Sequence, residues 1–255
     1  MVNLLERFPA LEFPLTAEEL SRLPRSIAFR YRLAAAGRRV LLSPHPALQN
    51  CLLDFRDRPA AAEHLPVGGA GSLRPLDTSD RTALQDLYHA AYSRTLPWSV
   101  LSATTARELT LDCLEWTYAG GDGWLVSPAC LGWFRKSAEI AGAPPALLGA
   151  ALVTLNPAGP LEDLTSPVWQ ESIPGDPLSV RWGRPHLHAI CVDPSWQRCG
   201  LSTALLQGVQ IALQGLGFTE LSSTVLIDNV PSLLWHWRVG FRPVGPIRTK
   251  SVTEE

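Results

Sequence analysis

The spacing of hydrophobic positions changes abruptly near residue 200. Residues 187–192 form a short apolar run that Asp193 and Pro194 interrupt, because proline lacks the N–H that a strand ladder needs. From residue 201 onward apolar residues recur at the three-and-four spacing of a one-sided helix, namely Leu201, Ala204, Leu205, Val209, Ala212 and Leu213. Gly215 and Gly217 supply left-handed positions at which this helix would end. The pattern therefore predicts a buried strand, a tight turn and an amphipathic helix.

The predicted turn comprises residues 197–202, with Gly200 at its centre. Glycine lets the backbone approach a ligand closely, and the first N–H groups of a helix have no acceptor within the helix. Such a turn attracts phosphate oxygens, so the sequence predicts a pyrophosphate site here.

The same reasoning gives a coarse description of the rest of the chain. Before residue 71 we expect a helix at 16–23, a strand at 26–33, a return through 39–42 and a linker at 66–71. After it we expect strands at 73–76, 124–126, 131–134, 147–155 and 220–227, helices at 79–93 and 104–118, a helix capped by Asn229, and a last strand or hairpin at 241–252. The proline-rich stretch 156–185 is too broken for regular structure, and we interpret it as a solvated insertion. We therefore expect an N-terminal extension at 1–70 and a main domain at 71–255.

Composition narrows the classes of function. The chain has 255 residues, a hydrophobic share of 46% and a formal net charge of −2, which favour a globular protein with small-molecule chemistry over one that binds DNA or RNA. The five cysteines are odd in number and lack metal-type spacing, as is typical of reduced thiols. We find neither a signal-peptide pattern nor a membrane-spanning run, so we expect a soluble cytoplasmic protein that does not bind membranes. The sequence leaves the oligomeric state open, a homodimer included.

Two linked motifs carry a resemblance to a known family. Gln197 to Ser202 resembles the Q/R-x-x-G-x-G/A signature of the GCN5-related N-acetyltransferases (GNAT), and residues 229–241 resemble the family's N-x-x-A-x-x-L-Y-x-x-x-G-F helix and its exit. The resemblance covers about residues 71–252. It implies an α/β (α+β) GNAT fold, in which helices flank a central mixed, mostly antiparallel sheet that is splayed at strands 4 and 5. It also implies an enzyme that moves an acetyl group from acetyl-CoA to an amine.

The strand before the glycine turn is similar to that of the arylalkylamine N-acetyltransferases, and residues 131–134 and 240–246 resemble the same subgroup. Strand alternation places His186, His188, Ile190 and Val192 on one face, with the two histidine backbones about 7 Å apart. The resemblance makes the histidines the pair that accepts, through water, a proton from a small primary amine, with arylalkylamines among the candidate amines. The nine tryptophans could supply an aromatic pocket for such an amine.

The resemblance also implies which residues bind the cofactor. Ile190 would offer its backbone N–H to the thioester carbonyl, Val192 would contact the pantetheine arm, and Arg198 would add positive charge beside the pyrophosphate. The full set that we expect to bind acetyl-CoA is Ile190, Cys191, Val192, Gln197, Arg198, Cys199, Gly200, Leu201, Ser202, Thr203 and Asn229.

Two residues depart from the family pattern. Ser202 stands where glycine or alanine is usual, and its hydroxyl would face the pyrophosphate. His236 stands where the family has the tyrosine that protonates the thiolate of coenzyme A. An imidazolium could donate that proton, and a neutral N–H could stabilise the sulfur, so we assign His236 a catalytic role.

Two alternatives remain open. These departures would also fit a regulatory module that binds coenzyme A without turnover. The second alternative is a metal site, because two alternating histidines on a strand, such as His186 and His188, can share a zinc ion. The sequence offers no convincing third ligand, so we expect no metal site.

Overall fold

The computed structural model describes residues 11–13, 29–33, 40–44, 47–56, 71–95, 98–135 and 145–249. The chain divides into two compact units, one of residues 52–223 and one of residues 1–51 together with 224–255. Each unit is described by itself below.

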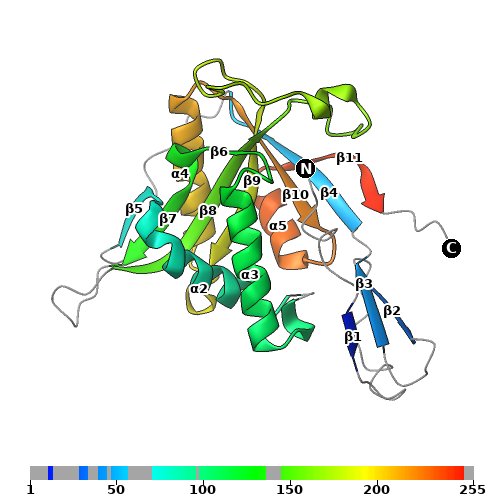
Figure 1. The fold of residues 1–255 in the computed structure, drawn as a ribbon. Coiled ribbons are helices and arrows are strands. Elements are labelled where there is room, and N and C mark those ends of the chain that lie inside the picture. The colour runs from blue at the N-terminus through cyan, green and yellow to red at the C-terminus, as the bar shows by residue number, and fades with distance from the viewer. Residues whose placement is uncertain are drawn as a thin grey trace. The chain divides into compact units, whose positions relative to one another are not determined.

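The larger unit is built on a mixed sheet (Figure 1). Its strands are β5 (Gly71–Pro75), β6 (Trp124–Leu125), β7 (Leu131–Arg135), β8 (Ala146–Asn156), β9 (Arg184–Val192) and the first part of β10 (Glu220–Leu226). The order is β10-β9-β8-β7-β5, and β6 also pairs with β8. The pairs among β5 to β9 are antiparallel, whereas β9 and β10 are parallel. The predicted mixed, mostly antiparallel sheet is confirmed.

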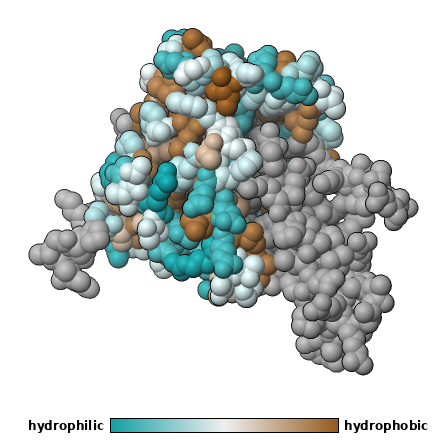
Figure 2. All heavy atoms as spheres, viewed as in Figure 1, coloured by the Kyte–Doolittle hydropathy of each residue, from teal (hydrophilic) through white to brown (hydrophobic). Residues whose placement is uncertain are grey.

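Helices cover both faces of this sheet. Helices α2 (Arg81–Tyr92) and α3 (Ala103–Tyr118) pack on each other, and α2 contacts β8 and β9. On the opposite face lies α4 (Leu201–Gly215), where a Cβ built on Gly149 would be 3.0 Å from Leu205. Residues 147–156 of β8 are all buried, as expected for a strand covered on both sides. The outward face of α3 carries charged residues, and the surface over it is hydrophilic (Figure 2); these residues are Arg107, Glu108, Asp112 and Glu115.

Local signals fix where the helices begin. Asp77 accepts a hydrogen bond from the Ser79 N–H, and the Asp80 carboxylate accepts one from the Asp77 N–H, so a reciprocal cap precedes α2. The 3-10 turn Thr78–Asp80 leads into α2, which therefore begins at Arg81, two residues after the predicted start. Ser102 caps α3 through the Thr105 N–H.

One irregularity of β9 shapes the centre of the sheet. Within the larger unit β9 pairs with β10 at Ser222↔His186 and Ser223↔Leu187. On the other side of β9, the register with β8 shifts between Leu152 and Val153, since Leu152 pairs with Ala189 and Val153 with Leu187. His188 therefore has no partner on β8 and forms a β-bulge.

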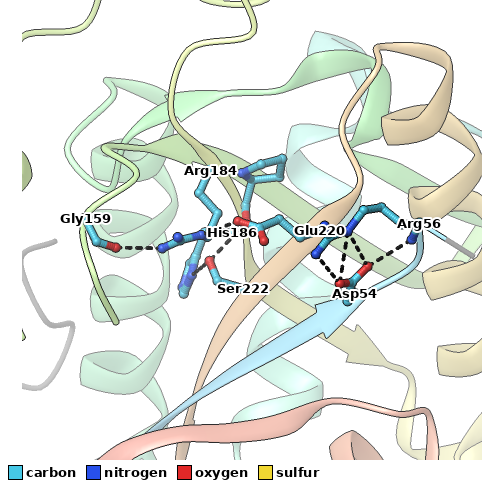
Figure 3. A network of polar contacts seen from close by, with 8 residues as sticks. Asp54, Arg56, Gly159, Arg184, His186, Glu220 and Ser222 are labelled. Atoms are coloured by element: carbon cyan, nitrogen blue, oxygen red, sulfur yellow. Dashed lines mark hydrogen bonds and ion pairs between the residues drawn. The ribbon is translucent and has the colours of Figure 1, made fainter. Parts of the chain in front are cut away.

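The stretch between β8 and β9 is irregular apart from the 3-10 helix η5 (Pro167–Gln170), as its prolines predict. Arg184, the first residue of β9, anchors it (Figure 3). Its Nη1 donates to the Gly159 carbonyl at 2.7 Å, and its Nε donates to Glu220 Oε1 on β10 at 2.6 Å. The insertion is thus attached to the sheet at the first residue of the histidine-bearing strand.

A segment before residue 71 also belongs to the larger unit. Leu53 and Phe55 are fully buried, and the Phe55 N–H donates to the Thr219 carbonyl at 2.9 Å. Just beside them Arg56 and Asp54 form an exposed ion pair (Figure 3). The sequence reasoning missed this strand, β4 (Ala47–Asp54), because its alternation is interrupted by Gln49 and Asn50.

The smaller unit contains a three-stranded antiparallel sheet of β1 (Leu11–Phe13), β3 (Val40–Pro44) and β2 (Phe29–Leu33), in that order. It also contains the first part of β4, the end of β10, α5 (Val230–Arg238) and β11 (Arg242–Thr249). The helix expected at 16–23 and most of the linker expected at 66–71 lie outside the described residues. No helix within the described ranges is both long enough and apolar enough to span a membrane.

Candidate active site

The glycine turn connects β9 to α4 through a series of local contacts. The Asp193 N–H donates to the Leu148 carbonyl at 2.9 Å and ends the strand, and the Asp193 side chain accepts from the Ser195 N–H at the start of the 3-10 helix η6 (Pro194–Trp196). Arg198 and Gly200 then adopt left-handed backbones with φ of 63° and 82°. Helix α4 begins at Leu201, as the hydrophobic pattern predicts.

The turn fits a phosphate group. A Cβ built on Gly200 meets no heavy atom within 4 Å, and no side chain caps the start of α4. The backbone is therefore open where the first N–H groups of the helix lack intrahelical acceptors. Positive charge is also at hand, since Arg198 lies in the turn and the Arg135 guanidinium lies 5.0 Å from the ring centre of Trp196.

Some residues predicted to bind the cofactor could do so only through their backbones. Leu201 is 1% exposed and packs toward Gly149, so its side chain belongs to the core. Cys191 is also buried, which raises the pKa of its thiol to about 12. Gln197, Cys199, Ser202 and Thr203 lie at the turn or in the first turn of α4, and Cys199 is exposed. The Gln197 amide lies 3.5 Å from the Val192 carbonyl.

The bulge at His188 divides the predicted row of residues 186, 188, 190 and 192. Residues that pair directly across antiparallel strands share a face. His186 pairs with Thr154, whereas Ile190 pairs with Ala151 and Val192 pairs with Gly149, which faces α4. The prediction that all four share one face is wrong, because one extra residue reverses the alternation: Ile190 and Val192 face α4, and the histidines lie on the side of α2 and α3.

The two histidines differ in their surroundings. His186 is 5% exposed, and its Nδ1 lies 3.0 Å from Ser222 Oγ, at the place where β9 and β10 pair (Figure 3). Because Ser222 donates its hydroxyl proton to the Pro185 carbonyl, its oxygen accepts from His186 Nδ1–H. His188 lies in the bulge, and its side chain is 14% exposed.

His188 contacts two buried residues that the sequence reasoning missed. Its Nε2 lies 3.2 Å from Thr117 Oγ1, on α3, and 3.6 Å from Asp122 Oδ2, in the turn after α3. Asp122 is 4% and Thr117 1% exposed. Burial lowers the pKa of His188, and the Asp122 carboxylate opposes that effect. His188 is therefore neutral at physiological pH and can accept a proton.

Asn229 and His236 lie in the smaller unit. Asn229 caps α5, accepting from the Ser232 N–H at 3.3 Å, as predicted. His236 is 3% exposed, and its Nδ1 lies 2.7 Å from the Ser232 carbonyl. A carbonyl only accepts, so Nδ1 carries a proton and Nε2 of the neutral ring has none to donate. Burial lowers the pKa of His236, which makes the imidazolium scarce at neutral pH.

No group of three or more metal-type side chains comes together within the described residues. The partners of His186 and His188 include Ser222, Thr117 and Asp122. The histidine pair is thus embedded in hydrogen bonds to hydroxyl and carboxylate groups.

Comparison with known proteins finds a family match for part of the chain. Residues 166–241, which include β9, the glycine turn and α4, match the sequence profile of the acetyltransferase (GNAT) family. None of the curated proteins matches the chain.

Several solved structures resemble the chain distantly. An aminoglycoside 6′-N-acetyltransferase from Acinetobacter haemolyticus is 16% identical, with 72% of this chain and 99% of that one covered and a TM-score of 0.44. A GCN5-related N-acetyltransferase from Sphaerobacter thermophilus is 16% identical, with 84% and 50% covered and a TM-score of 0.49. The PaiA N-acetyltransferase from Thermoplasma acidophilum, solved with coenzyme A, is 13% identical, with 68% and 90% covered and a TM-score of 0.44. The sequence match to the acetyltransferase (GNAT) family is thus confined to the segment that carries β9, the glycine turn and α4.

Proposed function

We propose that this protein is an acetyl-CoA-dependent N-acetyltransferase of the GNAT superfamily, which acetylates a primary arylalkylamine by direct attack on acetyl-CoA with His188 as the general base. The observation that carries the proposal is the position of His188: it is a neutral imidazole in a bulge of β9, the strand that leads into the glycine turn. A general base must be neutral at the working pH and close to the reacting amine.

Separate residues would bind the cofactor and move the proton. The turn from Gln197 to Thr203 would hold the pyrophosphate through backbone N–H groups, with Arg198 adding charge. Acetyl-CoA supplies the activated acetyl thioester. His188 would take the proton that the attacking amine loses, directly or through a water molecule. The backbone N–H of Ile190 on β9 would donate a hydrogen bond to the thioester carbonyl.

His186 would assist rather than act alone. Its Nδ1–H is held by Ser222, so the unprotonated nitrogen of the neutral ring is Nε2. Because His186 and His188 lie on the same side of β9, a water molecule could connect their rings. The pair would then pass the amine's proton away from the thioester.

An aromatic cluster supports an amine that carries an aromatic ring. The ring centre of Tyr92 lies 4.5 Å from that of Tyr88 and 5.3 Å from that of Trp98, and the ring centres of Tyr88 and Trp98 lie 6.4 Å apart. Tyr88 belongs to α2, whose face of the sheet is also the face of His188. Aromatic rings stack favourably at such separations, by about 0.5–1.5 kcal/mol a pair, which would favour an aromatic acceptor over an aliphatic one.

The test is to replace both histidines with glutamine and to measure turnover and affinity for coenzyme A separately. We expect turnover with tryptamine or phenethylamine to fall by about 10²-fold or more, since a positioned base contributes about 10²–10⁴. Affinity measured by calorimetry should stay unchanged, because the turn is untouched. Equal losses of turnover and affinity would make the histidines structural and refute the assignment.

The wild-type protein provides the test of substrate class. Arylalkylamines, polyamines and peptide N-termini should be compared at equal concentration by mass detection of the acetylated product. A clear preference for polyamines or peptides would contradict the aromatic acceptor.

A module that binds coenzyme A without turnover remains a second candidate because of His236, whose Nδ1–H is already bonded to the Ser232 carbonyl. The neutral ring offers no second N–H to a thiolate. Heat of binding with acetyl-CoA but no acetylated product from any amine class would favour this module.

A further inference from the structure

Three side chains from separate parts of the larger unit, those of Thr117, Asp122 and His188, contact one another at the bulge of β9. Thr117 Oγ1 lies 2.9 Å from Asp122 Oδ2 and 3.2 Å from His188 Nε2, and Asp122 Oδ2 lies 3.6 Å from the same nitrogen. Asp122 is 4% exposed. A buried carboxylate is costly unless polar groups compensate it, so this one must have partners.

Proton counting defines the direction of these contacts. Thr117 has one hydroxyl proton and two oxygen acceptors within reach, Asp122 Oδ2 and the Cys113 carbonyl at 3.0 Å. Asp122 Oδ2 can only accept and also lies 3.6 Å from His188 Nε2, so all three groups are satisfied when Thr117 donates to one of those oxygens and accepts from His188 Nε2–H. The proton of the neutral ring therefore belongs on Nε2, where it faces both the hydroxyl and the carboxylate, and Nδ1 holds the lone pair.

We propose that Asp122, with Thr117, is a positioning residue that keeps the proton of His188 on Nε2 and so presents Nδ1 as the base. This inference rests on the proposed function, in which His188 takes the proton of the amine. Asp122 touches neither substrate in this scheme and acts only through His188. An amide at this position could not hold the same tautomer as firmly, because it lacks the negative charge.

The charge of Asp122 also sets the pH at which His188 becomes neutral. A carboxylate favours the imidazolium and raises the pKa of His188, against the effect of burial. Tyr88 on α2 interacts electrostatically with Asp122, and burial raises the pKa of its hydroxyl, so Tyr88 does not ionise near neutral pH. Among the described residues Asp122 is therefore the charge to which His188 responds.

The test uses Asp122→Asn, Thr117→Val and a matched control, Asp112→Asn. Asp112 lies on the exposed face of α3, so its replacement removes the same charge from the same region without touching His188. For Asp122→Asn we expect kcat to fall about tenfold or more, a part of what a positioned base contributes. The acidic limb of the kcat/KM profile should move about one unit toward lower pH, because the carboxylate no longer favours the imidazolium.

Thr117→Val keeps the shape of the side chain and the Asp122 charge but removes the hydroxyl. It should lower kcat with little shift of the acidic limb. The affinity for coenzyme A should stay as in the wild-type protein for all three variants. If Asp122→Asn does not fold, the kcat and pH profile of Thr117→Val decide the question.

A double-mutant comparison separates this inference from the proposed function. In a His188→Gln background, Asp122→Asn should cause no further loss of kcat, since it acts through a base that is already absent. If His188→Gln alone keeps full turnover, the proposed base is wrong. If His188→Gln lowers turnover but Asp122→Asn and Thr117→Val keep the wild-type kcat and acidic limb, only the positioning role is overturned. Equal losses from Asp122→Asn with and without His188 would also overturn it.

Discussion

Replacing Gly200 with alanine provides the sharpest test of the glycine turn, because α4 has a matched glycine at its other end. Gly200 and Gly217 have φ of 82° and 83°, so an alanine at either position is forced into the same left-handed backbone. That conformation costs an L-residue about 1–2 kcal/mol. For a protein of this size the melting temperature of each variant should fall by about 2–8 °C.

The two variants should differ in affinity for coenzyme A. The new methyl group at residue 200 meets no protein atom within 4 Å and would occupy the space proposed for the pyrophosphate, whereas at residue 217 it approaches only the side chain of Arg181. We expect Gly200→Ala to weaken binding of acetyl-CoA more than tenfold, which is about 1.4 kcal/mol, and Gly217→Ala to leave it unchanged. Titration calorimetry on both proteins measures this directly. Wild-type affinity in Gly200→Ala, or equal losses in both variants, would refute the turn assignment.

Two further predictions concern the cysteines and acid stability. At mildly alkaline pH, iodoacetamide should alkylate exposed Cys199 well before the four buried cysteines, and saturating acetyl-CoA should slow the alkylation of Cys199. Peptide mass mapping measures both effects. Alkylation of Cys199 at the same rate with and without acetyl-CoA would argue against binding at the turn. Asp80 accepts hydrogen bonds from both Arg74 terminal nitrogens, which lowers the pKa of its carboxyl. This pair should stabilise the fold by about 1 kcal/mol, because Arg74 is partly exposed to water. The stabilisation should be present above pH ~3.9, the pKa of an unfolded aspartate, and should be lost as the pH falls through the lower pKa of the folded state. Denaturant unfolding from pH 7 to pH 2 should therefore show a smaller acid-dependent loss in Asp80→Asn than in the wild-type protein, and identical slopes would contradict this reasoning.

The sequence was sufficient for those parts of the site that depend on neighbouring residues. The strand ending at Val192, the open turn at Gly200 and the helix from Leu201 follow from apolar spacing, proline and glycine, all within about 30 residues. The end of that helix was predicted less well. Gly217 is left-handed as expected, but Gly215 remains helical, because one left-handed residue is enough to end a helix.

Contacts that depend on distant residues could not be predicted. A bulge adds one residue to a strand without changing its composition, so nothing in residues 184–192 reveals that His188 lacks a partner on β8. Asp122 lies in a glycine-rich turn 66 positions before His188 and resembles an ordinary turn carboxylate. Its burial and its partners become evident only when α3 packs against the sheet. The proton position on His236 likewise depends on a carbonyl one helical turn away.

The bulge has a consequence for how the two substrates would meet. His188 lies on the side of α2 and α3, whereas the glycine turn leads into α4 on the opposite side, and Ile190 and Val192 face α4. A cofactor held at that turn would approach His188 past the edge of β9 that faces away from β8, because β8 pairs with the other edge along its length. The register of one strand therefore sets both the position of the base and the place where the thioester could approach it.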